Sequence, residues 1–315
     1  MVTSIATRQV YGETLVQLGK ENDRIVVLGG DLNQSTGIAG FAKEFPERFY
    51  DFGAAEQNMM SVAAGLASSG KTVFASTFAV FGTSRPFDQI RVGIAQPKLN
   101  VKIVVTHSGL LTAEDGASAQ SIEDLSLMCA LPTFTVIVPA DGPETAQAVR
   151  LAAQTPGPFY IRLCRPATPI IHDDAYSFAL GQPEQLRGGA DVTIIASGPM
   201  VHYALVAAET LSSEGIEAGV INVATFKPIE PSLITSAAKS TNALVTVEEH
   251  YIHGGLNSII SQITGEHCPV PIEAVAVRKY AESGKADALF EKYGLNSPKI
   301  IAAAKKAIQR KAEAK

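Results

Sequence analysis

Short apolar runs alternate with longer helical patterns over the first 172 residues. The runs, each about four to six residues long, cover 24–28, 72–76, 101–106, 135–138 and 159–163. The helical patterns between them cover 9–19, 59–68 and 143–153. Regular alternation of buried strands with helices is typical of a parallel sheet covered by helices.

A polar stretch rich in glycine, proline and aspartate follows at residues 171–189, and then the alternation resumes. Strands are predicted at 192–196, 218–223, 243–247 and 272–277, with helices at 202–213 and 231–238. The pattern therefore predicts an α/β protein of two doubly wound domains. The first, mostly parallel, is expected over 1–172, a linker over 173–189, and a smaller domain over 190–315.

Composition narrows the function classes. The 315 residues are 46% hydrophobic, which is enough to bury a substantial core, and the formal charge is −5. This negative charge disfavours a general nucleic-acid binder. The only basic run is the short tail at 305–315, which points the same way. The start has no apolar signal core and no stretch is long enough to cross a bilayer, so a cytoplasmic protein is expected.

The three cysteines (Cys129, Cys164 and Cys268) are far apart and have apolar neighbours. We expect buried, reduced thiols and no metal or disulfide role. No glycine-rich dinucleotide motif and no phosphate loop with a Gly-Lys-Ser/Thr ending is present. A self-contained nucleotide site is therefore not expected.

Polar and glycine-rich sequence follows each predicted strand of the first domain, as at Gly29-Gly30-Asp31 and Thr106-His107-Ser108-Gly109. Because parallel strands end at one rim of a sheet, these segments should converge there. Ser35, a little further along the first of them, is also compatible with a plain helix cap.

Glu56 lies where a Gly-Ala-Ala turn enters a helix of small, apolar residues. Its carboxyl group could simply favour the helix start electrostatically. The surroundings of packed small residues also suit a part-protonated carboxyl that shares a proton with a ligand nitrogen. Both interpretations remain open at this level.

The segment 106–124 is long, polar and directly follows a strand, which is typical of a functional loop. His107 shares this loop with Asp115. Arg165 stands at the end of the last strand of the domain, where a guanidinium group suits capture of phosphate. An ion pair between domains is its alternative role.

Taken together, these segments resemble the carboxyl-terminal half of transketolase, the part that is a separate subunit in split transketolases. The resemblance covers essentially the whole chain. Its most specific motifs are Phe52-Gly-Ala-Ala-Glu-Gln-Asn-Met59, Ser76-Thr-Phe78, Thr106-His-Ser-Gly109 with Glu114-Asp-Gly116, and Val245-Thr-Val-Glu-Glu249.

The resemblance implies a pyrimidine-binding domain and a task for Glu56 with thiamine diphosphate. In the family this glutamate bonds the aminopyrimidine nitrogen and stabilises the imino tautomer, whose nitrogen removes the thiazolium C2 proton. Phe78 and Phe81 resemble the aromatic wall of the pyrimidine pocket, and Asp31 joins the cofactor-binding set. The family's third aromatic is less clear, because residues 82–87 differ in length and Phe87 is the nearest substitute.

By the same resemblance, Arg8, Ser35, His107 and Arg165 match a clamp for a sugar phosphate, and His107 joins Glu56 as a catalytic residue. Asp115 matches the acid that reads a hydroxyl of the donor sugar. The sequence departs from the family at Ala119, where a histidine usually contacts the sugar. The sugar specificity is therefore left open.

No Gly-Asp-Gly segment, which in the family binds the diphosphate and Mg2+, occurs anywhere in the chain. The resemblance thus implies a transferase that is active only with an amino-terminal partner subunit, in an assembly of two copies of each. The alternatives are the beta subunit of a 2-oxoacid dehydrogenase, a deoxyxylulose-phosphate synthase fragment, and a non-catalytic regulatory paralogue.

Overall fold

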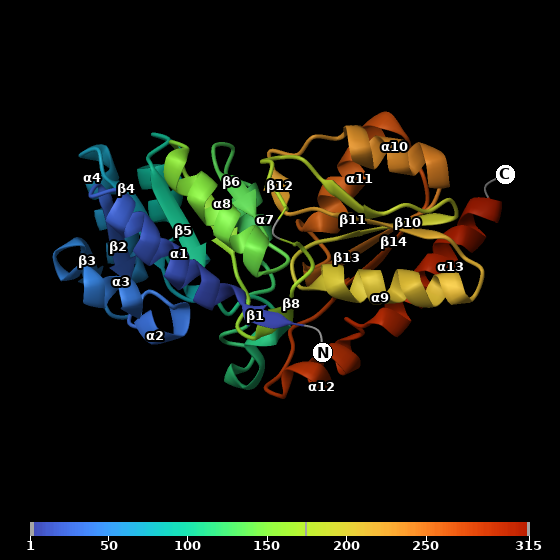
Figure 1. The fold of residues 1–315 in the computed structure, drawn as a ribbon, viewed down its shortest axis with the longest axis horizontal. Coiled ribbons are helices and arrows are strands. Elements are labelled where there is room, and N and C mark those ends of the chain that lie inside the picture. Colours follow the sequence, from blue (N-terminus) through green and yellow to red (C-terminus); the bar gives the residue numbers. More distant parts are fainter. Residues whose placement is uncertain (1–2, 174, 314–315) are drawn as a thin grey trace.

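The computed structural model describes residues 3–173 and 175–313 and consists of two α/β halves side by side (Figure 1). A seven-stranded sheet forms the first half, in the order β12-β6-β7-β5-β4-β2-β3. Neighbouring strands are parallel except β12, which runs antiparallel to β6. The strands are β2 (Ile25–Gly29), β3 (Phe49–Asp51), β4 (Thr72–Ser76), β5 (Val101–Val105), β6 (Thr135–Ile137), β7 (Phe159–Arg162) and β12 (Thr225–Lys227).

Helices connect these strands. They are α1 (Thr7–Glu21), α2 (Asn33–Thr36), α3 (Ala39–Glu44), α4 (Glu56–Ser68), α5 (Ala79–Thr83), α6 (Phe87–Gln89), α7 (Asp124–Cys129) and α8 (Gly142–Gln154). A π-helical segment continues α6, and two short 3-10 helices lie in loops. Their bounds are Ile90–Ala95, Pro46–Arg48 and Leu110–Asp115.

The second half has a five-stranded sheet in the order β14-β13-β10-β11-β9, in which only β9 is antiparallel to its neighbour. The strands are β9 (Glu184–Arg187), β10 (Val192–Ala196), β11 (Ala218–Asn222), β13 (Leu244–Tyr251) and β14 (Ile272–Val277). The helices are α9 (Met200–Ser213), α10 (Ser232–Thr241), α11 (Leu256–His267), α12 (Ala286–Tyr293) and α13 (Ser297–Glu313). A small antiparallel pair, β1 (Ser4–Ala6) and β8 (Ala167–Pro169), completes the fold.

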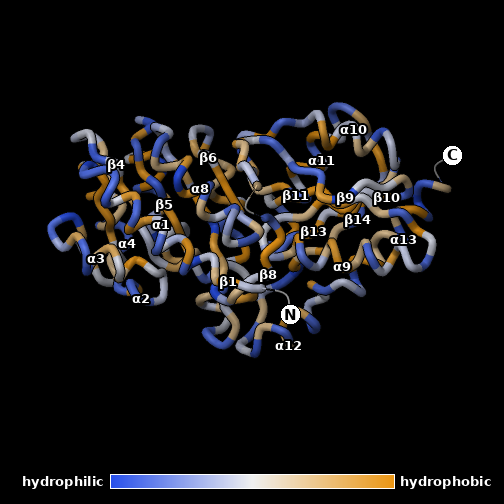
Figure 2. Tube along the Cα trace, viewed as in Figure 1, coloured by the Kyte–Doolittle hydropathy of each residue, from blue (hydrophilic) through white to orange (hydrophobic). Residues whose placement is uncertain are grey.

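The central strands are buried on both faces, as their continuous apolar runs predicted. Figure 2 shows hydrophobic segments along the strands of both sheets and hydrophilic segments in the outer loops. The predicted fold class is confirmed, and the predicted strands agree with the structure to within a few residues, except that β13 continues to Tyr251. Two of the three cysteines, Cys129 and Cys268, are only partly buried, which corrects the expectation that all three are buried; all three are free.

The two halves share structure across their boundary. Residues 184–187, inside the expected linker, form edge strand β9 of the second sheet. Strand β12 comes from the second half of the sequence but adds to the first sheet through β6. One hydrophobic cluster also joins Tyr160 to Ile195 and Leu256. The halves are therefore packed as one body around a common core.

Candidate active site

The carboxyl ends of the parallel strands β2, β4, β5 and β7 lie at one edge of the first sheet, and the expected site residues follow them. Asp31 follows β2, Phe78 follows β4, His107 follows β5 and Arg165 follows β7. The turn at Gly30 also approaches Thr77 and Gly53. The convergence expected from the sequence is thus present for these four segments.

Glu56 is the first residue of α4 and is only 3% exposed. Its Oε1 accepts a hydrogen bond of 3.0 Å from Nη1 of Arg85. The guanidinium carbon of Arg85 in turn lies 4.2 Å from the centroid of the Phe81 ring. Arg85 therefore contacts both the Glu56 carboxylate and the Phe81 ring.

The aromatic wall continues from Phe81 to His107. The Phe78 and Phe81 rings are nearly parallel, with centroids 6.0 Å apart. Phe78 also stacks with the His107 imidazole, and the centroids of these two rings are 3.7 Å apart. The expected third aromatic, Phe87, is partly buried against the main hydrophobic core. Glu56, Arg85, the two phenylalanines and His107 thus form one continuous row of contacts.

His107 is held as a neutral imidazole. Burial lowers the pKa of its ring to about 3, and the positive charges of Arg8 and Arg165 act in the same direction. Its Nδ1 lies 2.8 Å from Oγ1 of Thr106, which fixes the ring orientation. At neutral pH the ring is therefore a hydrogen-bonding group and carries no charge.

All four expected clamp residues are connected in space. Arg8 and Arg165 both act on His107 from the first turn of α1 and from the end of β7. Ser35 joins them through its backbone carbonyl, which accepts a hydrogen bond of 2.8 Å from Arg8. Ser35 lies inside α2, whose N-cap residue is Leu32, so the alternative helix-cap role of Ser35 is wrong.

Arg165 is surrounded by acceptors of the 106–124 loop. Its Nη1 donates to the Thr112 carbonyl at 2.9 Å and lies 3.5 Å from a Glu114 oxygen and 3.6 Å from an Asp115 oxygen. Both carboxylates belong to the first half, so these ion pairs do not join the domains. Asp115 and Arg165 are each about one third exposed and accessible to a ligand. Ala119, in the same loop, is buried.

The 106–124 loop is anchored from the second half of the chain. Oε1 of Glu249, on β13, accepts a hydrogen bond of 2.6 Å from the Leu111 N–H. Gly109 faces this carboxyl so closely that a Cβ there would lie 2.4 Å from its Cδ. Burial raises the pKa of Glu249. The nearby Arg162 charge acts in the opposite direction, and the resulting pKa is about 8. The loop that carries His107 therefore depends on a side chain 138 positions away.

A buried ion pair supports the same loop from beneath. Arg162 Nε donates to Asp124 Oδ2 at 2.8 Å, and neither side chain is more than 2% exposed. Arg162 also donates to the carbonyls of Ser121 and Glu249, both at 3.1 Å. Tyr160 donates a second hydrogen bond to the Asp124 carboxylate at 2.6 Å. Burial acts to raise the pKa of Asp124, but the Arg162 charge and the hydrogen bonds from Arg162 and Tyr160 contribute to a combined opposite effect that holds the pKa below the usual range.

Backbone strain gathers in the site loops. Among the described residues, five other than glycine have positive φ, and Asp31, His107 and Ala113 are three of them. Such conformations cost about 1–3 kcal/mol each and concentrate at functional sites. The two loops that carry the expected residues are thus held in shapes that the surrounding contacts must enforce.

Sequence reasoning missed two parts of this arrangement. Arg85 was not assigned a role, although its position four residues after Phe81 was a usable signal, because such spacing brings side chains together on a helical turn. The anchoring of the loop by Glu249 had no local signal. The Val245–Glu249 motif marked the segment but did not reveal its contact.

Comparison with known proteins identifies the family of this chain. A family model described as the transketolase pyrimidine-binding domain matches residues 3–170, and one described as the transketolase C-terminal domain matches residues 181–300. A putative transketolase C-terminal section from Methanocaldococcus jannaschii is 44% identical over 93% of each chain. The chain belongs to the transketolase family.

Further relatives show how much of a transketolase this chain covers. A solved structure of a split-gene transketolase, described as an inactive beta4 tetramer, superposes with a TM-score of 0.91 and is 48% identical, covering 98% of this chain and 99% of that one. Human transketolase is 40% identical over 95% of this chain, but the match spans only 48% of the human protein. This chain therefore corresponds to about half of the human protein, and membership of the family implies thiamine diphosphate.

The residues present fit one end of thiamine diphosphate. A buried carboxyl that Arg85 links to two stacked phenylalanines suits an aminopyrimidine ring, which needs an aromatic surface and a hydrogen-bond partner for its ring nitrogen. Among the described residues, atoms able to bind a metal gather instead at Glu144, His172 and Glu184, within 4.8 Å of one another. Glu144 lies in α8, His172 in the connection between the halves and Glu184 on β9. Among the described residues, no helix is long and apolar enough to cross a membrane.

Proposed function

We propose that this chain is the catalytic half of a split transketolase, which moves a two-carbon ketol unit from a ketose phosphate to an aldose or aldose phosphate. The observation that carries the proposal is the continuous row from Glu56 through the phenylalanines to His107, with Arg8 and Arg165 acting on the same imidazole. A carboxyl, an aromatic wall and a cationic pocket are the groups that this reaction needs from the pyrimidine side.

Glu56 would position a proton on the pyrimidine ring of the cofactor. When bound, thiamine diphosphate supplies the nucleophilic carbon for ketol transfer. Glu56 is buried, so water would not compete for its carboxyl group once the pyrimidine ring replaces Arg85 as its partner. Phe78 and Phe81 would hold the ring plane, and Asp31 would close the pocket from the neighbouring turn.

His107, Arg8, Ser35 and Arg165 would bind the sugar phosphate. Two guanidinium groups suit a dianion, since charge-assisted hydrogen bonds contribute about 1.5–3 kcal/mol each. The neutral His107 can donate to or accept from a sugar oxygen without adding charge. Asp115 would read a hydroxyl of the donor, and its contact with Arg165 would orient both side chains.

The diphosphate and Mg2+ would be held mainly by an amino-terminal partner subunit, in an assembly with two copies of each. This part rests on the absence of Gly-Asp-Gly from the sequence. The relative described as an inactive beta4 tetramer supports it, because that structure is a tetramer named for one kind of subunit.

A second substrate class has its own support. A 6-deoxy-6-sulfo-D-fructose transketolase subunit from a Clostridium species is 40% identical over 96% of this chain and 95% of its own length. Two arginines can bind a sulfonate as well as a phosphate. Ala119, which replaces the usual histidine near the sugar, also leaves room for a donor other than the usual pentose phosphates.

The test is reconstitution from two purified subunits. This chain is mixed with its amino-terminal partner, thiamine diphosphate and Mg2+, and ketol transfer is measured with a panel of ketose phosphates, 6-deoxy-6-sulfofructose and aldose acceptors. We expect activity only in the mixture. Activity of this chain alone would contradict the partner requirement, and an inactive mixture with every donor would favour a regulatory paralogue.

A further inference from the structure

A cavity in the second half is lined by four cationic side chains and lies outside the candidate active site. Arg278 and Lys279 follow β14, Lys292 lies in the last turn of α12 and Lys299 lies in the first turn of α13. The cavity measures about 360 Å3, which is in the range of small-molecule sites. Three separate elements thus bring positive charge to one hollow of a chain whose formal net charge is −5.

The lining contains no carboxylate. It consists of the four cations with Tyr293, Gly294, Val275 and three alanines. Lys292 pairs with Glu282 outside the lining, and among the described residues neither Arg278 nor Lys299 has a carboxylate partner. Because Arg278 and Lys299 have no such partner, an anion in the cavity would be attracted mainly by these two charges.

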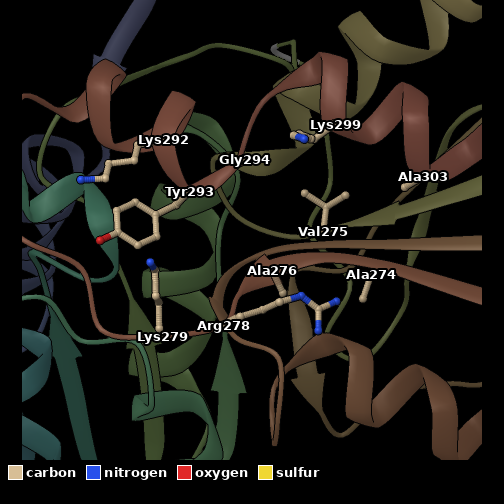
Figure 3. A pocket seen from close by; sticks show the side chains of 10 residues that line it. All are labelled: Ala274, Val275, Ala276, Arg278, Lys279, Lys292, Tyr293, Gly294, Lys299 and Ala303. Carbon is tan, nitrogen blue, oxygen red and sulfur yellow. The ribbon is translucent and has the colours of Figure 1, made fainter.

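The cations are arranged around a partly apolar wall. In the view of Figure 3, Arg278 and Lys299 lie on opposite sides of Val275, and Lys279 and Lys292 lie on opposite sides of the Tyr293 ring. The Lys279 ammonium is 5.8 Å from the centroid of that ring. A ligand in this cavity would contact cationic side chains at its edges and apolar side chains along its wall.

Gly294 helps to place Lys299. It ends α12 in the left-handed conformation, with φ of 72°. A Cβ at this position would lie 3.2 Å from Cγ of Lys299, so a glycine lets the lysine stem lie close against the backbone. The position of this cation is therefore set by the backbone turn.

We propose that this cavity binds a phosphate monoester with a small planar or apolar organic group. Arg278 offers the paired donors that suit phosphate, and the lysines supply further charge. The aromatic face of Tyr293 and the apolar wall would contact the organic part. The site is separate from the sugar phosphate clamp and does not depend on the function proposed above, because none of its lining residues belongs to the first half.

Calorimetric titration of the purified chain tests the site, with AMP, inorganic phosphate and adenosine as probes. We expect AMP and phosphate to bind and adenosine not to bind. The double variant Arg278→Gln with Lys299→Gln should weaken AMP binding at least about 10-fold, since each charge-assisted hydrogen bond contributes at least that factor. These side chains are exposed, so folding should survive.

Two further variants separate this site from other sources of affinity. Lys98→Gln with Lys239→Gln removes the same charge from exposed positions elsewhere and should leave AMP binding unchanged. Arg8→Gln with Arg165→Gln removes the clamp and should leave unchanged the AMP binding that is lost in the Arg278 and Lys299 variant. Loss of binding in the clamp variant, equal binding of adenosine, or full binding in the Arg278 and Lys299 variant would each overturn the proposal, as would the absence of AMP binding to the unaltered chain.

Discussion

Arg85 decides how Glu56 is held in the chain by itself. The carboxylate is almost fully buried, while Arg85 is 51% exposed and rests on Phe81. A buried carboxylate without a partner would be costly, and the arginine removes most of that cost. A pyrimidine ring placed against the aromatic wall would compete with Arg85 for the same carboxylate.

The first prediction at this scale concerns the role of Glu56. In the assembled complex, Glu56→Gln should slow hydrogen–deuterium exchange at C2 of thiamine diphosphate by about 100-fold or more, because it removes a positioned proton-transfer group. Exchange is followed by NMR after acid quenching. Glu209→Gln, on the exposed surface of α9, is the matched control and should exchange normally. An unchanged rate in Glu56→Gln would return Glu56 to a purely structural role at the helix start.

Arg165 supports a second prediction, on acceptor selectivity. Arg165→Ala should lower kcat/KM for a phosphorylated aldose about 10- to 150-fold, which corresponds to one lost charge-assisted contact. The value for glycolaldehyde, which has no phosphate, should change little. Steady-state kinetics with both acceptors measures this.

The control for that experiment is Arg150→Ala, which breaks an exposed ion pair with Glu21 outside the site. Because Arg165 also bonds the Thr112 carbonyl, its removal could loosen the loop and not only the clamp. Equal losses for both acceptors would indicate that structural role.

At the scale of elements, the 106–124 loop is held by contacts with β13 in addition to its own hydrogen bonds, such as that from the Gly109 N–H to the Ser121 carbonyl at 2.7 Å. Glu249 bonds Leu111, and Arg162 bonds the carbonyls of Ser121 and Glu249. His250, the next residue on β13, accepts a hydrogen bond of 3.2 Å from the Leu125 N–H at the start of α7. One strand of the second half therefore sets both the middle and the end of the loop.

Gly109 makes this dependence testable. Gly109→Ala places a methyl group against Glu249 and forces a left-handed backbone at φ of 64°. We expect a loss of about 2–3 kcal/mol in the free energy of unfolding, from strain and the disrupted contact together, and a lower kcat of the complex. Urea denaturation and kinetics measure the two effects.

Gly70→Ala provides the comparison. The φ of Gly70 is also positive, at 84°, but among the described residues no atom beyond its chain neighbours lies within 4 Å of the added Cβ. It should lose only about 1–2 kcal/mol, the cost of the left-handed backbone. If both variants lost the same stability and kept full activity, the contact between Gly109 and Glu249 would have no role in shaping the loop.

At the scale of the whole molecule, a buried polar network joins the two halves around His172. Its Nδ1 lies 3.0 Å from Asp141 at the start of α8, and its Nε2 lies 2.9 Å from Glu184 on β9. Glu144 completes the network through hydrogen bonds from Tyr176 at 2.6 Å and from Asn222 at 3.0 Å. Hydrogen-bonded and charged side chains thus connect the first half, the segment between the halves and the second sheet.

The network predicts a loss of stability at alkaline pH. Burial alone would lower the pKa of His172, but the hydrogen bond to Asp141 and the charge of Glu144 raise it to about 9. A histidine with a raised pKa in the folded state contributes stability that is complete below its unfolded pKa of about 6.5 and is lost as the pH rises through about 9. The free energy of unfolding should therefore fall between pH 7 and pH 9.5.

His172→Gln tests that assignment by urea denaturation at both pH values. We expect the variant to lose about 3 kcal/mol at pH 7, as for a broken buried ion pair, and to show a smaller further loss at pH 9.5 than the unaltered chain. His202→Gln, on a partly buried histidine of α9, should keep the pH dependence of the unaltered chain. The same slope in all three proteins would exclude His172 as its source.

The sequence by itself determined the elements and the edge where chemistry gathers. Apolar runs of strand length and helical spacing depend on neighbours within a few positions, so they identify β2, β4, β5 and β10 to within one or two residues. The rim follows from the parallel sheet, which places Asp31, Phe78 and His107 together before any coordinate is known. The family motifs then supplied expected roles for these residues.

Only the tertiary structure decided which groups meet. Arg85 reaches Glu56 across 29 positions, Glu249 reaches the His107 loop across 138, and β12 leaves its own half to extend the first sheet. The neutral state of His107 likewise depends on burial and on two arginines from distant segments. Local pattern records which face of an element is apolar, whereas contact between distant polar side chains depends on how the elements pack, and that is settled only when the whole chain folds.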